Sequence, residues 1–429
     1  MLIIGAGPGG YETAVEAVKR GMEVTLITEG PLGGTCLNEG CIPTKTFCHY
    51  AELIEQNLKA GLDCKPTFAA AAERKLAVIE QLRGGISMLL KNVEVVQGRA
   101  QFKDAKTVSC NGQEYTADKI IIATGSVSAS LPVPGAENCI TSKEILELKE
   151  VPASLCVIGG GVIGLEFASI FRSFGSEVTV LEFCPNILPR FDTDLAKRLK
   201  QSLSKRGINI EVQAQVTRID GNTVTYIKKE KEFTVQADKI LMAVGRRPNT
   251  DGLNLEAAGI DYTRKGITVN DRFETSVPGI YAVGDVTGGI MLAHAATYQG
   301  LHALNCICGQ TDTIRFDLIP AAVFTMPEVA TIGLTEEQCK EQNLEFRCLK
   351  SFYRANGKAV SMDETDGYCK AIMDNNGKIL GAHLMGAHAS DLIHEIAVAI
   401  NLGATLEQLQ SVIHAHPALS EVLQSAFHQ

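Results

Sequence analysis

The sequence lacks several features that define other classes of protein. No apolar run approaches the roughly 18 residues needed to cross a bilayer, which argues against an integral membrane protein. No leader-like segment precedes the strand-like run at residues 2–4, so we expect a cytoplasmic protein. Basic residues are fewer than acidic ones. The sequence has 40 Lys and Arg and 49 Asp and Glu, which gives a net charge of −9. This balance argues against nucleic acid as the main partner.

What is present indicates a multidomain enzyme. The chain has 429 residues, 45% of them hydrophobic, which is too long for one core and predicts two to four domains. Its 13 cysteines are scattered. Most lie in apolar or strand-like surroundings, as Cys156 and Cys184 do, and we expect buried free thiols there. Cys36 and Cys41 are different, since only five positions separate them in a glycine-containing segment.

Two segments of the chain share one layout. In each, a short apolar strand leads into a glycine-rich turn, a helix follows, and a second strand ends in an acid. The first turn is GAGPGG at 5–10, with Glu29 as its acid, and the second is GGGVIG at 159–164, with Glu182. This order is the beginning of a dinucleotide-binding βαβ unit. A purely structural glycine turn is the alternative for either copy alone, whereas two copies in matching context favour two dinucleotides.

The glycine spacing has a physical purpose. The first glycine allows a tight turn, the second lets a pyrophosphate approach the backbone, and the third lets helix and strand pack closely. The helix N-terminus then offers free N–H groups and partial positive charge to the phosphates. Glu182 can accept hydrogen bonds from ribose hydroxyls and would repel a 2′-phosphate, with no Lys or Arg nearby before Arg190. The second unit therefore favours NAD over NADP, and Glu29 is expected to play the same part for the other nucleotide.

The rest of the chain continues this α/β pattern and then departs from it. Further apolar strands are predicted to end at 123–125 and 243–245, where each runs into a glycine turn, and a helix is predicted at 195–203. From about Phe316 the character changes. Strands predicted at 367–373 and 379–385 precede helices at 390–402 and 420–427. This part is predicted to be a separate α+β domain.

The segment at 33–45, GGTCLNEGCIPTK, carries the chemistry. Two cysteines five apart on a straight helix would lie about 140° apart around its axis, too far for an unstrained disulfide. Gly40 and Pro43 suggest that the regular helix begins only after Cys41, so that the preceding turn brings the sulfurs together. Cys41 would then sit near a helix N-terminus, which stabilises a thiolate. A zinc site, which needs two further ligands, and an inert pair of thiols are the alternatives.

The same segment resembles the active-site signature of the class I pyridine nucleotide–disulfide oxidoreductases. The resemblance extends over nearly the whole chain, through 123–126, 245–249, 275–285 and 324–336. It implies an α/β fold with two Rossmann-like dinucleotide-binding domains, for FAD and NAD, and a C-terminal α+β dimerisation domain. The implied domains are an FAD domain with the redox disulfide at 1–137, an NAD domain at 138–260, a central segment completing the FAD site at 261–313, and the interface domain at 314–429.

The resemblance also assigns cofactor contacts. Asp285 would bind the ribityl chain of FAD, and Lys45 would pair with Glu166 beside the flavin. The full set for FAD is Gly5, Gly7, Gly9, Gly10, Glu29, Gly34, Thr35, Lys45, Ala100, Thr124, Gly125, Gly284, Asp285 and Ala293. The set for NAD is Gly159, Gly161, Val162, Ile163, Gly164, Glu166, Glu182, Val216, Gly245 and Arg246. No metal is implied, and the thiols and imidazole near Cys306 are expected to serve packing.

The stretch at 414–421, HAHPALSE, is similar to that of the family members that oxidise dihydrolipoamide. It implies a catalytic set of Cys36, Cys41, His416 as general base and Glu421 as its orienting acid. A homodimer is implied, in which His416 serves the cysteines of the other subunit. The implied partner is the lipoylated carrier protein of a 2-oxo acid dehydrogenase or glycine cleavage complex.

Two alternatives remain open at this point. One is another FAD-dependent disulfide reductase, similar to glutathione or mercuric reductase. The other is a noncatalytic subunit that keeps the fold. Within the active-site loop, Glu39 stands where an apolar residue is commoner in the family, which implies a change in redox poise.

Overall fold

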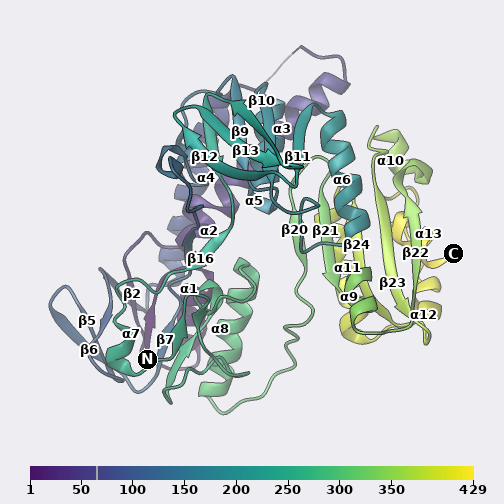
Figure 1. The fold of residues 1–429 in the computed structure, drawn as a ribbon. Coiled ribbons are helices and arrows are strands. Elements are labelled where there is room, and N and C mark those ends of the chain that lie inside the picture. Colours follow the sequence, from purple (N-terminus) through teal and green to yellow (C-terminus); the bar gives the residue numbers. More distant parts are fainter. Residues whose placement is uncertain (64–65) are drawn as a thin grey trace.

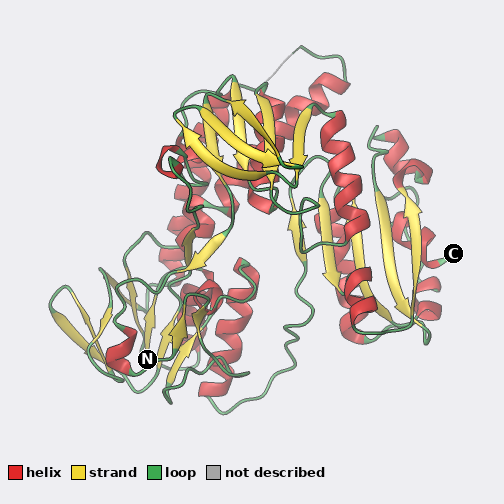
Figure 2. Cartoon of the chain, viewed as in Figure 1, coloured by secondary structure: helices red, strands yellow, loops and turns green. Residues whose placement is uncertain are grey.

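The computed structural model describes residues 1–63 and 66–429, which form three bodies (Figures 1 and 2). Two are α/β units on parallel sheets, and the third, at the right of Figure 1, is an antiparallel sheet with helices. A long irregular connection along the bottom of Figure 1 joins α8 (Ala293–Ile307) of the first unit to β20 (Ala321–Val323) of the third. The predicted fold class, two Rossmann-like units followed by an α+β domain, is confirmed.

The first unit is built on a five-stranded parallel sheet. Its strand order is β19-β7-β1-β2-β3, comprising Ile280–Ala282, Ile120–Ile122, Leu2–Ile4, Thr25–Thr28 and Glu94–Gln97. The central strands β1 and β7 are runs of three buried aliphatic residues, as expected for a parallel sheet covered on both faces. The segment after residue 260 supplies β19, an edge strand of this sheet.

Helices cover this sheet and carry the cysteine segment. On one side α1 (Pro8–Lys19) packs against α8, and the cysteines lie on α2 (Gly34–Glu39) and α3 (Cys41–Lys59). The long helix α4 (Phe68–Leu89) is capped at its N-terminus by Thr67, whose hydroxyl accepts a hydrogen bond from the N–H of Ala70. A small antiparallel sheet and short elements complete the unit: β4 (Gln101–Phe102), β5 (Thr107–Cys110), β6 (Gln113–Thr116), α7 (Leu255–Ala258), β17 (Tyr262–Thr263) and β18 (Gly266–Ile267).

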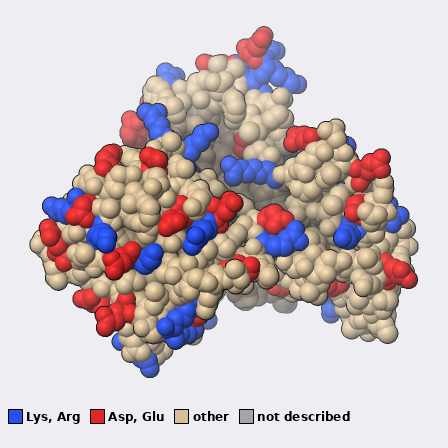
Figure 3. Space-filling view, turned by 90° about the horizontal axis from the view of Figure 1, so that it is seen from below, with Lys and Arg blue, Asp and Glu red and all other residues tan. Residues whose placement is uncertain are grey.

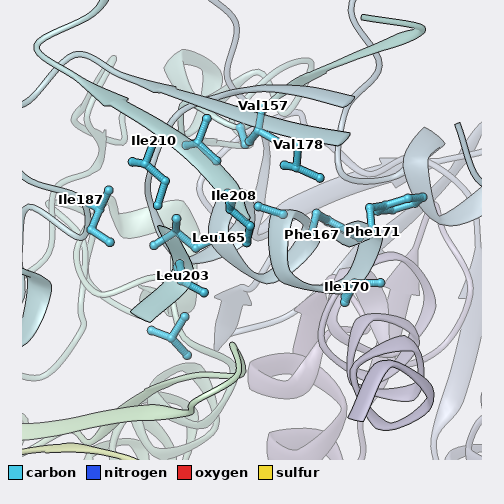
Figure 4. Packing of buried hydrophobic residues seen from close by; sticks show 14 of the residues in the cluster. Val157, Leu165, Phe167, Ile170, Phe171, Val178, Ile187, Leu203, Ile208 and Ile210 are labelled. Atoms are coloured by element: carbon cyan, nitrogen blue, oxygen red, sulfur yellow. The ribbon is translucent and has the colours of Figure 1, made fainter. Parts of the chain in front are cut away.

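The second unit repeats the parallel architecture. Its sheet has the order β11-β10-β9-β15, comprising Ile208–Val212, Glu177–Glu182, Ser154–Ile158 and Lys239–Met242. Helices α5 (Val162–Phe174) and α6 (Thr193–Lys205) pack on it, and Figure 4 shows Leu165 and Phe167 of α5 in one buried cluster with strand residues such as Ile208 and Val157. An antiparallel sheet lies beside it, made of β12 (Gln215–Asp220), β13 (Thr223–Lys228) and β14 (Lys231–Gln236).

A two-stranded antiparallel ladder links the first two units. Strand β8 (Ser126–Ser128) pairs with β16 (Arg246–Pro248). Each of these strands follows directly after a predicted strand-to-glycine turn, at 123–125 and 243–245. The two turns are therefore held next to each other where the units meet.

The third body is a five-stranded antiparallel sheet with the order β20-β21-β24-β23-β22. Its remaining strands are β21 (Val329–Gly333), β22 (Phe346–Phe352), β23 (Tyr368–Asp374) and β24 (Ile379–Met385). Helix α11 (Ala389–Leu402) packs on β21 and β24, and α13 (Glu421–Phe427) packs on β22 and β23. The shorter helices are α9 (Glu336–Glu341), α10 (Gly357–Ser361) and α12 (Leu406–Gln410). The strands and helices predicted from residue 367 onward are confirmed to within one residue.

Two further properties of the fold are its lack of membrane-spanning helices among the described residues and the distribution of charge on its surface. In the described part of the chain, no helix is long and apolar enough to cross a membrane. Acidic and basic side chains are interspersed on the face shown in Figure 3.

Candidate active site

The two glycine-rich turns have matching geometry. Gly5 and Gly159 have φ values of +106° and +112°, and a Cβ at either would collide with the carbonyl that ends the neighbouring strand. A Cβ at Gly10 or Gly164 would collide with the carbonyl of Gly5 or Gly159. The first and third glycines therefore serve the tight turn and the close helix–strand packing, as predicted.

The middle glycine of each turn faces open space. Gly7 and Gly161 are the N-cap residues of α1 and α5, and a Cβ at either would touch nothing within 4 Å. The N–H groups of the first helical turn are thus approachable by a ligand, and the helix dipole favours an anion there. Both turns fit the pyrophosphate of a dinucleotide.

The two acids that end the second strands differ in their surroundings. Glu29 is exposed at the end of β2. Glu182 is buried, and its carboxylate accepts hydrogen bonds from the N–H groups of Gly160 and Cys184, each at 2.6 Å. Each carboxylate oxygen has a further lone pair, so Glu182 is held beside the turn while still able to accept from a ribose.

The cysteine segment bends where the sequence predicted, although its first half is helical. Residues before Gly40 form the short helix α2 rather than the expected turn, and α3 begins at Cys41. Gly40 separates the two helices with φ −142° and ψ −108°, and this change of direction places the thiols of Cys36 and Cys41 in hydrogen-bonding contact. The predicted approach of the sulfurs is confirmed.

The two thiols are inequivalent. The hydrogen bond from Cys36 lowers the pKa of Cys41 below its usual value, against the opposing effect of burial, and the positive charge of Lys45 acts in the same direction. The same hydrogen bond raises the pKa of Cys36, and burial adds to this effect. Cys41 is therefore the residue that carries the thiolate in the reduced pair, as expected for a cysteine at a helix N-terminus.

Lys45 is fixed one turn beyond Cys41. Its Nζ lies 2.9 Å from both carboxylate oxygens of Glu166, which is 4% exposed, and 4.5 Å from the centre of the Phe324 ring. The backbone N–H of Phe324 also donates to Glu166, at 3.0 Å. The predicted Lys45–Glu166 pair is confirmed, and it ties together α3, α5 and the segment that follows β20. The assignment of Glu166 to the NAD site remains a prediction.

A chain of hydrogen bonds connects the first unit to the second beside the β8–β16 ladder. Ser126 Oγ donates to Asp285 Oδ2 at 2.5 Å, and Arg246 donates from Nε to Ser126 Oγ and from Nη2 to Ser126 O, both at 2.7 Å. Asp285 lies in the short helix Gly284–Thr287. The sequence had marked Asp285 and Arg246 but missed Ser126, although it directly follows the predicted site residues Thr124 and Gly125.

The predicted general base and its orienting acid are in contact. His416 Nδ1 lies 2.9 Å from Glu421 Oε1, and Glu421 Oε2 accepts the N–H of Ala418 at 2.8 Å. The His416 side chain is 79% exposed. In Figure 1, α13, which begins at Glu421, lies at the right edge of the molecule, well away from α2 with Cys36. One chain therefore does not bring His416 to its own cysteines.

The structure also gives the positions of the other predicted residues. The glycine-turn and helix-start residues lie at the ends of strands or the first turns of helices, and they are Gly9, Gly34, Thr35, Gly125, Val162, Ile163, Gly245, Gly284 and Ala293. Ala100 and Val216 are buried in apolar clusters of the first and second units, and their predicted cofactor contacts remain predictions. Thr124 donates to the carbonyl of Asn249 at 2.7 Å. Glu39 pairs with Lys143 at 2.6 Å. No metal-binding cluster occurs among residues 1–63 and 66–429.

Comparison with known proteins agrees with this geometry. The model of the pyridine nucleotide-disulphide oxidoreductase family matches residues 1–300, and the model of that family's dimerisation domain matches residues 319–427. Dihydrolipoyl dehydrogenase of Geobacillus stearothermophilus is 41% identical over 444 residues, covering 99% of this chain and 94% of that protein. A Bacillus subtilis (strain 168) dihydrolipoyl dehydrogenase is 42% identical over 447 residues, covering 99% and 95%.

Solved structures show the same arrangement. The HOCl-induced flavoprotein disulfide reductase RclA of Escherichia coli superposes with a TM-score of 0.90 at 33% identity, covering 100% of this chain and 99% of that one. LpdA of Mycobacterium tuberculosis gives a TM-score of 0.90 at 29% identity, covering 100% and 98%. The chain belongs to the pyridine nucleotide-disulphide oxidoreductase family.

Proposed function

We propose that the chain is a dihydrolipoyl dehydrogenase, which oxidises the dihydrolipoamide of a lipoylated carrier protein and reduces NAD⁺. The observation that carries this proposal is the inequivalent pair of thiols, with Cys41 beside the Lys45–Glu166 ion pair. The His416–Glu421 contact and the relatives named dihydrolipoyl dehydrogenase support the same activity.

The residues fit the two cofactors of this activity. The Gly5–Gly10 turn, exposed Glu29 and Asp285 would hold FAD, and the Gly159–Gly164 turn with Glu182 would hold NAD. Bound FAD supplies the two-electron chemistry that connects the cysteine pair to NAD⁺. The protein's own part is to align the thiols and to stabilise charge.

The steps that use this chain's residues begin with the Cys36–Cys41 disulfide. His416 accepts the proton of one dihydrolipoamide thiol, and the resulting thiolate attacks the sulfur of Cys36. The bond between the two cysteines breaks, and Cys41 leaves as a thiolate that Lys45 stabilises. The second substrate thiol then attacks the mixed disulfide, so that lipoamide departs as a disulfide and Cys36 takes up a proton. Two electrons pass from substrate to the cysteine pair.

A second copy of the chain would complete this site. His416 lies within the region that matches the dimerisation domain and contacts Glu421, the first residue of α13, and α13 lies on the opposite side of the molecule from α2. In a two-fold dimer each subunit would contribute its His416 to the cysteines of the other, because such an interface is isologous. Homodimer formation is thus part of the proposed function.

A steady-state panel tests the proposal against its alternatives. The holoenzyme is assayed with dihydrolipoamide and NAD⁺ or NADP⁺, and with glutathione disulfide and NADH or NADPH. We expect turnover with dihydrolipoamide and NAD⁺, and none of significance with glutathione disulfide. Preference for NADPH with glutathione disulfide would identify a different disulfide reductase, and absence of all turnover would identify a noncatalytic subunit.

A further inference from the structure

A cluster of polar groups at the C-terminal end of α8 lies outside the proposed active site. Cys306 and His302 are one helical turn apart, with Sγ 3.7 Å from Nε2. His302 Nδ1 lies 2.8 Å from Asp312 Oδ2, in the segment that follows the helix. The three residues thus form a line from thiol to imidazole to carboxylate.

The contacts fix the tautomer of the imidazole. A carboxylate only accepts hydrogen bonds, so Nδ1 of His302 must carry the hydrogen in its contact with Asp312. In the neutral ring Nε2 is then bare and able to accept the proton of the Cys306 thiol. This division of roles between thiol, imidazole and carboxylate is the one that activates a nucleophile in general.

Both the carboxylate and the ring are held in place. Asp312 also accepts hydrogen bonds from Asn305 Nδ2 at 2.8 Å and from the N–H of Ile314 at 3.1 Å. Although burial opposes it, these bonds and that of His302 lower the pKa of Asp312, which keeps the carboxylate charged. Edge-on contacts with Phe273 and Phe316, at centroid distances of 5.9 and 5.5 Å, hold the His302 ring.

A guanidinium also lies beside Cys306, whose side chain is partly accessible. Arg272 Nη2 donates to the carbonyl of Cys306 at 3.4 Å, and its hydrogen bond to the Cys306 side chain raises the pKa of Arg272. Cys306 is half-buried. The neighbouring Cys308 is more exposed and forms the same kind of contact with Arg20, so the feature that distinguishes Cys306 is its contact with His302.

We propose that Cys306, activated by His302 and Asp312, is a site of modification by low-molecular-weight disulfides, separate from the Cys36–Cys41 centre. The Cys306 thiol gives its proton to His302 Nε2, and the thiolate attacks one sulfur of the disulfide. A bond forms between the Cys306 sulfur and that sulfur, the S–S bond of the reagent breaks, and the departing thiolate takes up the proton. The protein gains a mixed disulfide and one molecule of thiol is released.

The test is a site-by-site measurement of reaction rates on the oxidised FAD holoenzyme with glutathione disulfide as the probe, read by peptide mass spectrometry. In wild type, Cys306 is expected to react about tenfold faster than Cys308 despite its lower exposure, since His302 Nε2 is placed to accept the thiol proton of Cys306 during the attack. Iodoacetamide, a second probe that needs no leaving thiol, should give the same order. A faster reaction at Cys308 with both probes would overturn the proposal.

Variants separate activation from exposure. His302→Gln and Asp312→Asn should each slow the reaction at Cys306 about tenfold, because the first removes the group that accepts the thiol proton and the second removes the carboxylate that orients it, and leave Cys308 unchanged. Asp317→Asn is the matched control, because Asp317 lies in the same segment but pairs with Arg315. Unchanged rates at Cys306 in both variants, or an equal loss at Cys308 and Cys306, would contradict the assignment. If neither variant folds, the ratio of the Cys306 and Cys308 rates in the wild-type enzyme tests the proposal.

Discussion

Lys45 Nζ lies 2.9 Å from both carboxylate oxygens of Glu166, one helical turn from Cys41. The ammonium group thus has a fixed position from which it lowers the pKa of the Cys41 thiol. This arrangement links the redox cysteine of the first unit to α5 of the second.

Replacing Lys45 should therefore change the ionisation of Cys41. In the reduced enzyme we expect the alkylation rate of Cys41 to be half-maximal at a pH below the pKa of an ordinary cysteine. Lys45→Met should move this midpoint upward, because loss of a nearby positive charge disfavours the thiolate. Lys45→Arg keeps the charge and is the control. A midpoint that does not move in Lys45→Met would show that Lys45 does not act on Cys41.

The contacts of Glu182 lead to a prediction about cofactor choice. Glu182→Arg should weaken the use of NAD⁺ about tenfold, by removal of a charged acceptor for the ribose, and improve the use of NADP⁺ relative to wild type. Because Glu182 also accepts the N–H groups of Gly160 and Cys184, Glu182→Gln is needed as a control that retains an acceptor there. Initial rates with each nicotinamide measure the effect. An unchanged preference in Glu182→Arg would mean that this residue does not face the ribose.

The two histidine–glutamate pairs of the third body allow a matched comparison. His416 contacts Glu421 and His414 contacts Glu395, each at 2.9 Å. His416→Ala should lower kcat by about 10²- to 10⁴-fold, as loss of a general base does. Glu421→Gln should lower kcat by less, whereas Glu395→Gln should stay close to wild type. Equal losses in the two glutamine variants would assign Glu421 a general structural role.

Subunit complementation tests whether the site is shared. Cys36→Ser and His416→Ala are expected to be inactive alone. After dissociation and random reassociation, about a quarter of wild-type sites should return, since half the dimers are mixed and each has one complete site. Mixed dimers that form but recover no activity would show that His416 does not serve the other chain.

Regular elements with a strong local pattern were predictable from the sequence. Strand β24 was predicted at 379–385 and occupies those residues, because its run is apolar and bounded by turn residues. Helix α2 was not predicted. Its six residues include Gly34 and Asn38, which have weak helical preference, and it is held by packing and by the hydrogen bond from Asn38 Nδ2 to the carbonyl of Gly34.

The site was predictable where one short motif contains the chemistry. The cysteine pair and the His416–Glu421 contact each lie within a single stretch, and both are present in the structure. Contacts between residues that are far apart in the sequence have no short motif that would predict them. Ser126 and Asp285 are 159 positions apart, and Asp312 lies in an irregular segment beyond α8, so their partners become apparent only from the fold.

The most direct measurement maps the free thiols of the oxidised holoenzyme before and after anaerobic addition of one equivalent of dihydrolipoamide. Cys36→Ser serves as the control, because it cannot form the disulfide. Before addition, Cys36 and Cys41 should resist alkylation, and after addition both should be labelled, with one lipoamide formed for each pair. Adding NAD⁺ should restore the protected state. Labelling of the two cysteines that is the same before and after dihydrolipoamide would contradict the account, because electrons would then reach NAD⁺ without passing through this pair.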